Sequence, residues 1–275
     1  MSIASIRRSI RDRLSPETRA RLQPIKRALA FLGSDYIPRY LRALNYAYGP
    51  GRRVIPYRPG NRVWKSSVPF AVLTNMEAGV YRHTYRDIPF LKWPFEIAIY
   101  EQLVWRLKPR TILEVGSFRG GSALWFSDMM RTYEIPGRIV SIDITVPKVP
   151  YQRDNIEFLE CDANYLERVL TPEFVATLER PILWIEDANH YYETCLAALR
   201  VIDRFIEPGE YLIVEDGSMS DLGITNGEPN GGPSPAISRF LMETKGRYEI
   251  DAALCDKYGH NATSNPNGYL RRVAN

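Results

Sequence analysis

The 275-residue sequence has few cysteines and histidines and no long hydrophobic run. Its three cysteines are odd in number and far apart, which fits neither a disulfide framework nor a zinc cluster (Cys161, Cys195 and Cys255). Three histidines are too few for a histidine-rich metal site. No apolar stretch approaches the roughly 18–20 residues of a membrane span, and the first residues lack the apolar core of a secretory signal. We therefore expect a reduced, cytoplasmic protein.

Charge is distributed unevenly along the chain. Residues 1–65 hold 15 Lys and Arg against 3 Asp and Glu, whereas the remaining 210 residues hold 21 against 29. A basic segment attached to an acidic body indicates an anionic partner for that segment, which could be a membrane surface, a nucleic acid or the body itself.

The basic segment has the pattern of amphipathic helices. Apolar residues recur at helical spacing over residues 3–14 and again over residues 22–32. We therefore predict a basic helical arm and linker over residues 1–70, ahead of a catalytic domain over residues 71–275. The apolar stripe could pack on the body or on a second subunit, which favours a homo-oligomer. It could instead lie on an anionic membrane, at the inner face.

From about residue 92 the chain alternates between buried strands and helices. This alternation predicts an α/β fold with an open, doubly wound Rossmann-like sheet of seven strands, the last of them antiparallel. Ligands of such sheets bind outside the carboxyl ends of the strands. The predicted strands are residues 110–116, 138–143, 156–161, 181–186, 210–215, 248–250 and 268–272, and the predicted helices are 94–107, 122–130, 190–205 and a last one that ends at Lys245, after a loop over residues 217–235.

The first three strand ends carry a glycine turn and acidic residues. Glycines let the backbone approach a ligand, and the N-terminus of the next helix supplies N–H donors. An acid at the end of the second strand is placed to accept ribose hydroxyls, and one after the third to meet an adenine amino group. This pattern predicts an S-adenosylmethionine pocket that is contacted by Glu114, Gly116, Ser117, Gly120, Gly121, Ser122, Asp143 and Asp162.

Three more acids follow the fourth and fifth strands. Asp187 ends the fourth strand, and Glu215 and Asp216 end the fifth. Burying three carboxylates together without a cation is costly, so they predict an oxygen-ligand site for Mg²⁺ or Mn²⁺. His190 lies three residues after Asp187, where its imidazole could take a proton from a metal-polarised hydroxyl.

Several segments, in order along residues 80–273, resemble the cephalosporin hydroxylase/rhamnosyl O-methyltransferase family. The resemblance implies a class I methyltransferase fold, a divalent metal at Asp187, Glu215 and Asp216, and a catalytic base at His190. The segments are Tyr85–Lys92, Ile112–Leu124, Asp187–His190, Pro208–Asp216 and Asn267–Arg272.

The function that we predict is S-adenosylmethionine-dependent and divalent-metal-dependent O-methylation of a sugar hydroxyl, with His190 and Asp187 as catalytic residues. The acceptor could be a free sugar, a glycolipid, a polysaccharide or a glycosylated natural product. Two alternatives remain open. A metal-dependent hydroxylase would need two histidines and a carboxylate, and His190 is the one histidine at a strand end. An RNA methyltransferase could use the basic arm, but its Asn-Pro-Pro-Tyr motif is absent, so we expect no nucleic-acid partner.

Overall fold

The computed structural model describes residues 55–56, 62–224 and 231–275. Residues 52–275 belong to one compact unit. The two helices predicted for the arm, and the arm's relation to a membrane or a second subunit, lie outside the described residues. Among the described residues, no helix is both long and apolar enough to cross a membrane.

A mixed sheet forms the centre of the domain, in the order β1-β9-β10-β8-β7-β4-β5-β6. Strands β4 to β8 run parallel to one another, and β10 is antiparallel to both of its neighbours. The predicted doubly wound sheet and its antiparallel last strand are therefore confirmed. The strands are β1 (Ile55–Pro56), β4 (Thr111–Val115), β5 (Arg138–Asp143), β6 (Ile156–Glu160), β7 (Ile182–Glu186), β8 (Tyr211–Val214), β9 (Tyr248–Ile250) and β10 (Tyr269–Arg272).

All seven predicted strands are present, and β1 adds a two-residue strand at the edge beside β9. A separate hairpin, β2 (Thr84–Tyr85) with β3 (Ile88–Pro89), was also not predicted. Strands of two residues have no period that a sequence pattern can reveal, and both depend on the partner strand for their conformation.

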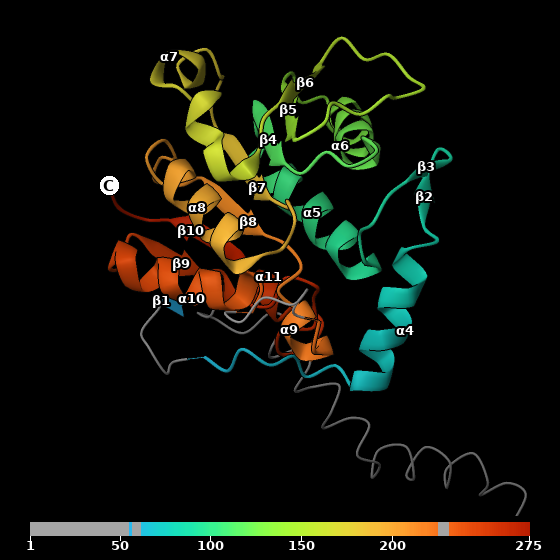
Figure 1. The fold of residues 1–275 in the computed structure, drawn as a ribbon, viewed down its shortest axis with the longest axis vertical. Helices are drawn as coiled ribbons and strands as arrows, with labels where there is room; N and C mark the ends of the chain where they lie inside the picture. The colour runs from blue at the N-terminus through green and yellow to red at the C-terminus, as the bar shows by residue number, and fades with distance from the viewer. Residues whose placement is uncertain (1–54, 57–61, 225–230) are drawn as a thin grey trace, which may run out of the picture. The chain divides into compact units, whose positions relative to one another are not determined.

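Helices cover both faces of the sheet (Figure 1). On one face, α5 and α6 pack through the edge-to-face rings of Tyr100 and Phe126. On the other, α8 contacts both α10 and the 3-10 helix η1. The helices are α4 (Phe70–Val80), α5 (Pro94–Leu107), α6 (Gly121–Thr132), η1 (Ala163–Arg168), α7 (Pro172–Val175), α8 (Tyr192–Ile202), α9 (Met219–Leu222), α10 (Pro233–Thr244) and α11 (Ala252–Cys255).

The structure differs from the predicted helices in three places. Helix α8 begins at Tyr192 rather than at His190, because His190 has a positive φ of 60° that no α-helix accommodates. The loop predicted for residues 217–235 contains the short helix α9 and the start of α10, and its residues 225–230 are outside the described part of the chain. Helix α4 was not predicted.

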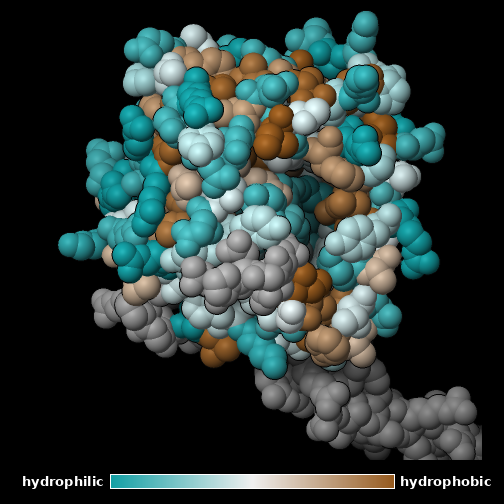
Figure 2. All heavy atoms as spheres, in the orientation of Figure 1, coloured by the Kyte–Doolittle hydropathy of each residue, from teal (hydrophilic) through white to brown (hydrophobic). Residues whose placement is uncertain are grey.

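The sequence explains the central elements directly. All five residues of β4 are buried, as a strand with neighbours on both edges and helices on both faces requires. Helix α5 has Pro94 in its first turn and buries residues at the i, i+3, i+4 spacing of one helical face. Figure 2 shows hydrophobic residues in small groups among hydrophilic ones on the face in view, as expected for a domain whose core is inside.

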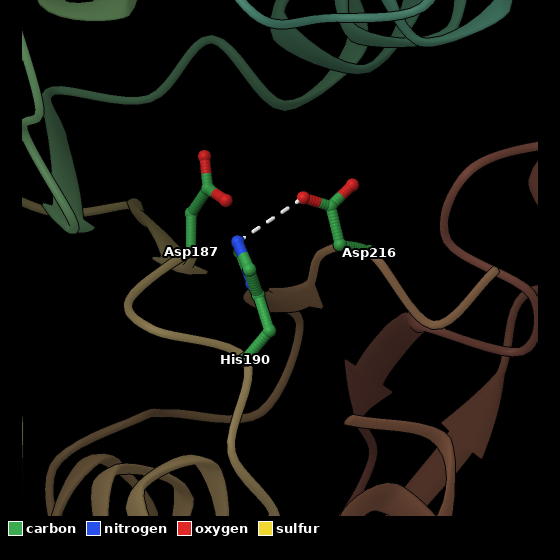
Figure 3. Close-up of side chains that lie close together, drawn as sticks. All are labelled: Asp187, His190 and Asp216. Carbon is green, nitrogen blue, oxygen red and sulfur yellow. Dashed lines mark ion pairs between the residues drawn. The ribbon is translucent and has the colours of Figure 1, made fainter. Parts of the chain in front are cut away.

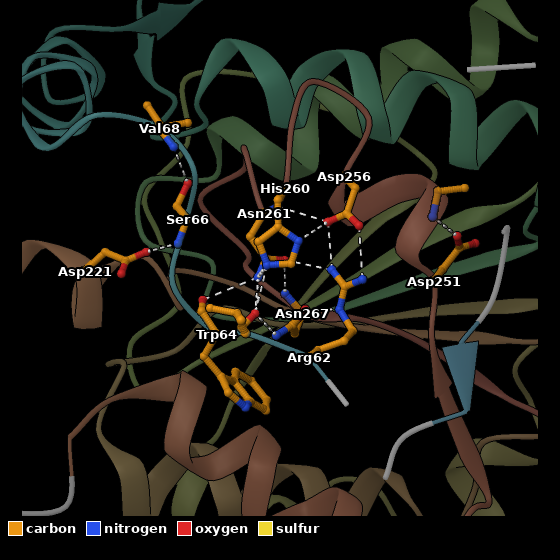
Figure 4. A network of polar contacts seen from close by, with 12 residues as sticks. Arg62, Trp64, Ser66, Val68, Asp221, Asp251, Asp256, His260, Asn261 and Asn267 are labelled. Atoms are coloured by element: carbon orange, nitrogen blue, oxygen red, sulfur yellow. Dashed lines mark hydrogen bonds and ion pairs between the residues drawn. The ribbon is translucent and has the colours of Figure 1, made fainter. Parts of the chain in front are cut away.

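Residues 62–68, which we call the strap, lie against the loop that precedes β10 (Figure 4). Arg62 donates to both carboxylate oxygens of Asp256, at 3.0 and 2.7 Å, and to the Asn267 side chain at 2.7 Å. The backbone N–H of Ser66 donates to Asp221 at 2.8 Å. The strap therefore packs on the domain, whereas the predicted boundary at residue 70 remains a prediction.

Glu96 is a fully buried carboxyl group beneath the same loop. One of its oxygens accepts hydrogen bonds from the Thr263 hydroxyl and the Ser264 N–H, and the other has no partner. Burial raises the pKa of Glu96 to about 7, because the two hydrogen bonds only partly offset the loss of solvent.

Substitution Glu96→Gln should therefore change how stability depends on pH. The raised pKa means that the folded protein holds this proton more tightly than the unfolded chain does. The resulting stabilisation is present below pH about 4.5 and is lost as the pH rises to about 7. Glu96→Gln should remove this loss, which amounts to roughly 3 kcal/mol. Denaturant titrations between pH 5 and 8 would show a flatter profile. Glu101→Gln, an exposed residue of the same helix, should keep the wild-type slope.

Candidate active site

A cavity of about 730 Å³ opens at the carboxyl ends of the parallel strands. Its lining includes residues that follow β4, β5, β6, β7 and β8. The strand order reverses between the neighbouring strands β4 and β7, and sheets of this kind have their ligand crevice outside the carboxyl ends of the strands at such a point. The cavity therefore lies where an open α/β sheet binds its ligands, as the sequence predicted.

The turn after β4 requires glycine. Gly116 has a φ of 112°, and a Cβ atom at this position would lie 1.9 Å from the Asp187 carbonyl oxygen. The next two backbone N–H groups, of Ser117 and Phe118, both donate to one carboxylate oxygen of Asp143 at 2.8 Å. The glycine thus brings the ends of β4 and β7 together, and Asp143 fixes the turn from the end of β5.

Of the eight predicted cofactor-binding residues, six line the cavity and two do not. Glu114 is fully buried and accepts a hydrogen bond from the Ser141 hydroxyl at 2.7 Å. At Gly120, the space of a side chain is taken by Val149 and Tyr151. The structure therefore does not support the prediction that Glu114 and Gly120 contact a ligand in this cavity directly. The six that line it are Gly116, Ser117, Gly121, Ser122, Asp143 and Asp162.

Three of the predicted catalytic and metal-binding residues lie together at one part of this cavity. One ligand atom each of Asp187, His190 and Asp216 lies within 4.8 Å of the others. His190 Nε2 is 3.3 Å from Asp216 Oδ2, and Figure 3 shows both carboxylates around this edge of the imidazole. His190 and Asp216 both have positive φ values, 60° and 57°. Such backbone conformations are costly for these residues and persist where the surrounding structure imposes them.

Glu215 lies beside this group, and both of its carboxylate oxygens already have partners. Lys92 Nζ contacts Glu215 Oε2 at 2.5 Å and Asp187 Oδ2 at 2.6 Å. The Tyr100 hydroxyl donates to Glu215 Oε1 at 2.5 Å. Glu215 is therefore outside the group formed by Asp187, His190 and Asp216, although it adjoins that group through Lys92. Its predicted role as a metal ligand remains a prediction.

The site has strongly perturbed protonation equilibria. Burial raises the pKa of Asp216 to about 6, and this effect exceeds the opposing one of His190. For His190, burial disfavours the charged imidazolium, but the surrounding carboxylates outweigh burial and raise its pKa. For Lys92, burial likewise favours the neutral amine, but Asp187 and Glu215 raise its pKa well above the ordinary value. The ammonium group is therefore charged.

The charge balance of the site fits a divalent cation. When ionised, the carboxylates of Asp187, Glu215 and Asp216 carry three negative charges against the one positive charge of Lys92. Burial raises the pKa of Glu215 and of Asp216, because this excess is costly without a further cation or a proton to offset it. Carboxylate oxygens with room for water and substrate oxygens suit Mg²⁺, which binds through one or two carboxylates and keeps several waters.

Lys92 and Tyr100 are the site residues that the sequence analysis missed. Lys92 stands in an apolar run, Phe90-Leu-Lys-Trp-Pro-Phe95, and is only 3% exposed. A lysine inside such a run is unusual because buried lysines need a partner. That signal indicates a buried ion pair, but the partner became visible only in the structure.

Comparison with known proteins agrees with the fold. Residues 78–273 match the family "Rhamnosyl O-methyltransferase/CmcI". The rhamnosyl O-methyltransferase of Mycobacterium leprae is 30% identical over 203 residues, which are 69% of this chain and 82% of the relative. That of Mycobacterium tuberculosis H37Rv is 28% identical over 195 residues, 69% of this chain and 78% of the relative.

Solved structures of CmcI share the fold. One described with SAH is 23% identical, covers 81% of this chain and 100% of its own, and has a TM-score of 0.55. One described with Mg and SAM is also 23% identical, covers 84% and 95%, and has a TM-score of 0.53. The fold is thus that of the class I methyltransferases. The chain belongs to the rhamnosyl O-methyltransferase/CmcI family, and the predicted family resemblance is confirmed.

Substitution Gly116→Ala should damage this site specifically. The new methyl group would collide with the Asp187 carbonyl and force the ends of β4 and β7 apart. We expect binding of S-adenosylhomocysteine, measured by calorimetry, to weaken by at least about tenfold. Gly79→Ala is the matched control, since a Cβ atom there meets nothing within 4 Å. Equal affinities for the two variants would contradict a close backbone approach at this turn.

Proposed function

We propose that this protein transfers the methyl group of S-adenosylmethionine to a sugar hydroxyl, with a divalent cation, Mg²⁺ or Mn²⁺, at Asp187, Glu215 and Asp216. One observation carries the proposal: a single cavity joins the Gly116 turn and Asp143 to the cluster of Asp187, His190 and Asp216. The first part suits a nucleoside cofactor, and the second suits an acceptor hydroxyl. The names of the relatives make a rhamnosyl group the first acceptor to test.

The residues of the chain have distinct roles in this reaction. Asp143 and the backbone after Gly116 would hold the ribose and the amino acid part of the cofactor, in the cavity that Asp187 also lines. A bound divalent cation would lower the pKa of the acceptor hydroxyl. Holding both reactants in one cavity supplies the orientation on which methyl transfer depends.

His190 is the proton acceptor in this proposal. Its Nε2 faces the carboxylates of Asp187 and Asp216, whereas Nδ1 is buried without a partner. The acceptor oxygen would attack the methyl carbon as the carbon–sulfur bond breaks, with its electron pair remaining on sulfur. The hydroxyl proton would pass to His190. Any cation that offsets the neighbouring carboxylates also counteracts the raised pKa of His190 and so favours the neutral form that a base requires.

Metal dependence can be tested with labelled S-adenosylmethionine and a panel of glycan acceptors, rhamnosides first. Transfer should be lost in EDTA and restored by added Mg²⁺ or Mn²⁺, since the acceptor hydroxyl needs a cation to lower its pKa. Product analysis by mass spectrometry would identify the methylated oxygen. Undiminished transfer after complete metal removal would refute the metal assignment.

The substitution His190→Ala should leave the affinity for S-adenosylhomocysteine nearly unchanged and lower kcat by roughly 10²–10⁴-fold, the range for loss of a general base. Single-turnover kinetics would measure the chemical step. His83→Ala removes an exposed histidine and should retain the wild-type rate. A His190→Ala rate close to wild type would show that another group accepts the proton.

We propose further that the protein is cytoplasmic and that the basic arm mediates homo-oligomer assembly, with membrane contact as the alternative. The 15 basic residues in positions 1–65 support an acidic partner, and the acidic remainder of the chain offers one. Deleting residues 1–33 should lower the native mass measured by light scattering. Unchanged mass together with loss of co-sedimentation with anionic vesicles would instead support a membrane-bound arm.

A further inference from the structure

Lys92 is a cation that the fold itself places among the proposed metal ligands. Its Nζ atom lies 2.6 Å from Asp187 Oδ2 and 2.5 Å from Glu215 Oε2, and its side chain is 3% exposed. Lys92 also lines the cavity. The ammonium group therefore occupies coordination directions of two carboxylates that the proposed function assigns to a divalent cation.

The backbone around Lys92 is held tightly. Phe90 and Trp93, on either side, are 2% and 1% exposed, and the Trp93 indole donates to Glu77 at 3.1 Å. A Cβ atom at Gly121 would lie 2.2 Å from the Pro89 carbonyl oxygen, so helix α6 packs directly on this segment. Any displacement of the Lys92 ammonium group would therefore have to come from its side-chain torsions rather than from its backbone.

A fixed positive charge at this distance opposes a second cation. Two like charges a few ångströms apart in a partly buried site repel each other even at an effective dielectric constant of about 20. The same lysine offsets the mutual repulsion of the carboxylates when they hold no metal. Its two effects thus have opposite signs: it stabilises the folded site without metal and weakens the binding of metal.

We propose that Lys92 is a positioning residue that competes with the divalent cation for Asp187 and Glu215 and thereby sets the metal affinity of the site. This inference rests on the proposed function. Competition of this kind holds the carboxylates together in the metal-free protein and keeps metal binding weak enough to respond to the arrival of cofactor and acceptor oxygens.

The test is Mn²⁺ binding to the full-length protein without cofactor or acceptor, followed by the electron paramagnetic resonance signal of free Mn²⁺. Lys92→Met should tighten Mn²⁺ binding by at least about tenfold, because a like charge has been removed. Thermal unfolding should show a lower Tm for the metal-free variant and a larger rise in Tm on addition of Mn²⁺ than for the wild type.

Two further variants keep the test decisive. Lys92→Gln retains hydrogen-bond donors for the carboxylates and should fold even if Lys92→Met does not, with the same tightening of Mn²⁺ binding. Lys148→Met removes a charge from an exposed lysine of the same cavity and should stay within about threefold of the wild-type Kd.

The possible outcomes distinguish a failure of this inference from a failure of the proposed function. Unchanged or weaker Mn²⁺ binding by both folded Lys92 variants, with normal binding by the wild type, overturns the competition and leaves the proposed function intact. Failure of the wild type to bind Mn²⁺ overturns the metal assignment of the proposed function, and the inference falls with it.

Discussion

The structure depends on the crowding of negative charge at one end of its sheet. Strands β7 and β8 are parallel neighbours with Glu186 opposite Val214, so the residues that follow them must lie side by side. Those residues are Asp187, Glu215 and Asp216. Their repulsion has to be offset within the site, and the lysine, the tyrosine hydroxyl and the histidine around them each contact at least one carboxylate.

The sheet and most of its site could be predicted because they depend on local patterns and on one topological rule. Buried runs followed by an acid or a glycine mark strand ends, and parallel strands bring those ends to one edge. Asp143, Asp187 and Asp216 were found in this way and do lie at one cavity. Lys92 could not be found in this way. It reaches the site from a loop, and only the packing of α5 and α6 fixes the position of that loop.

The arrangement of the candidate metal ligands could not be predicted from the strand ends alone. The sequence predicts Asp187, Glu215 and Asp216 as metal ligands with His190 beside them. In the structure His190 lies with Asp187 and Asp216, whereas Glu215 contacts Lys92 and Tyr100. The difference arises because spacing along the chain does not encode side-chain direction. Residues at positive φ, such as His190 and Asp216, turn their side chains away from the path that a regular helix or strand would give. Each oxygen of Glu215 nevertheless retains a second lone pair for a cation.

The site also bears on the hydroxylase that the family resemblance includes. An iron oxygenase of the common type needs two histidines and a carboxylate on adjacent faces of the metal. Among the described residues that line the cavity, His190 is the one histidine, and its neighbours are carboxylates. Oxygen ligands of this kind suit a hard, redox-inactive cation such as Mg²⁺. Together with the Gly116 turn beside Asp143, which suits a nucleoside, this donor set favours group transfer to an oxygen over oxidation of a carbon.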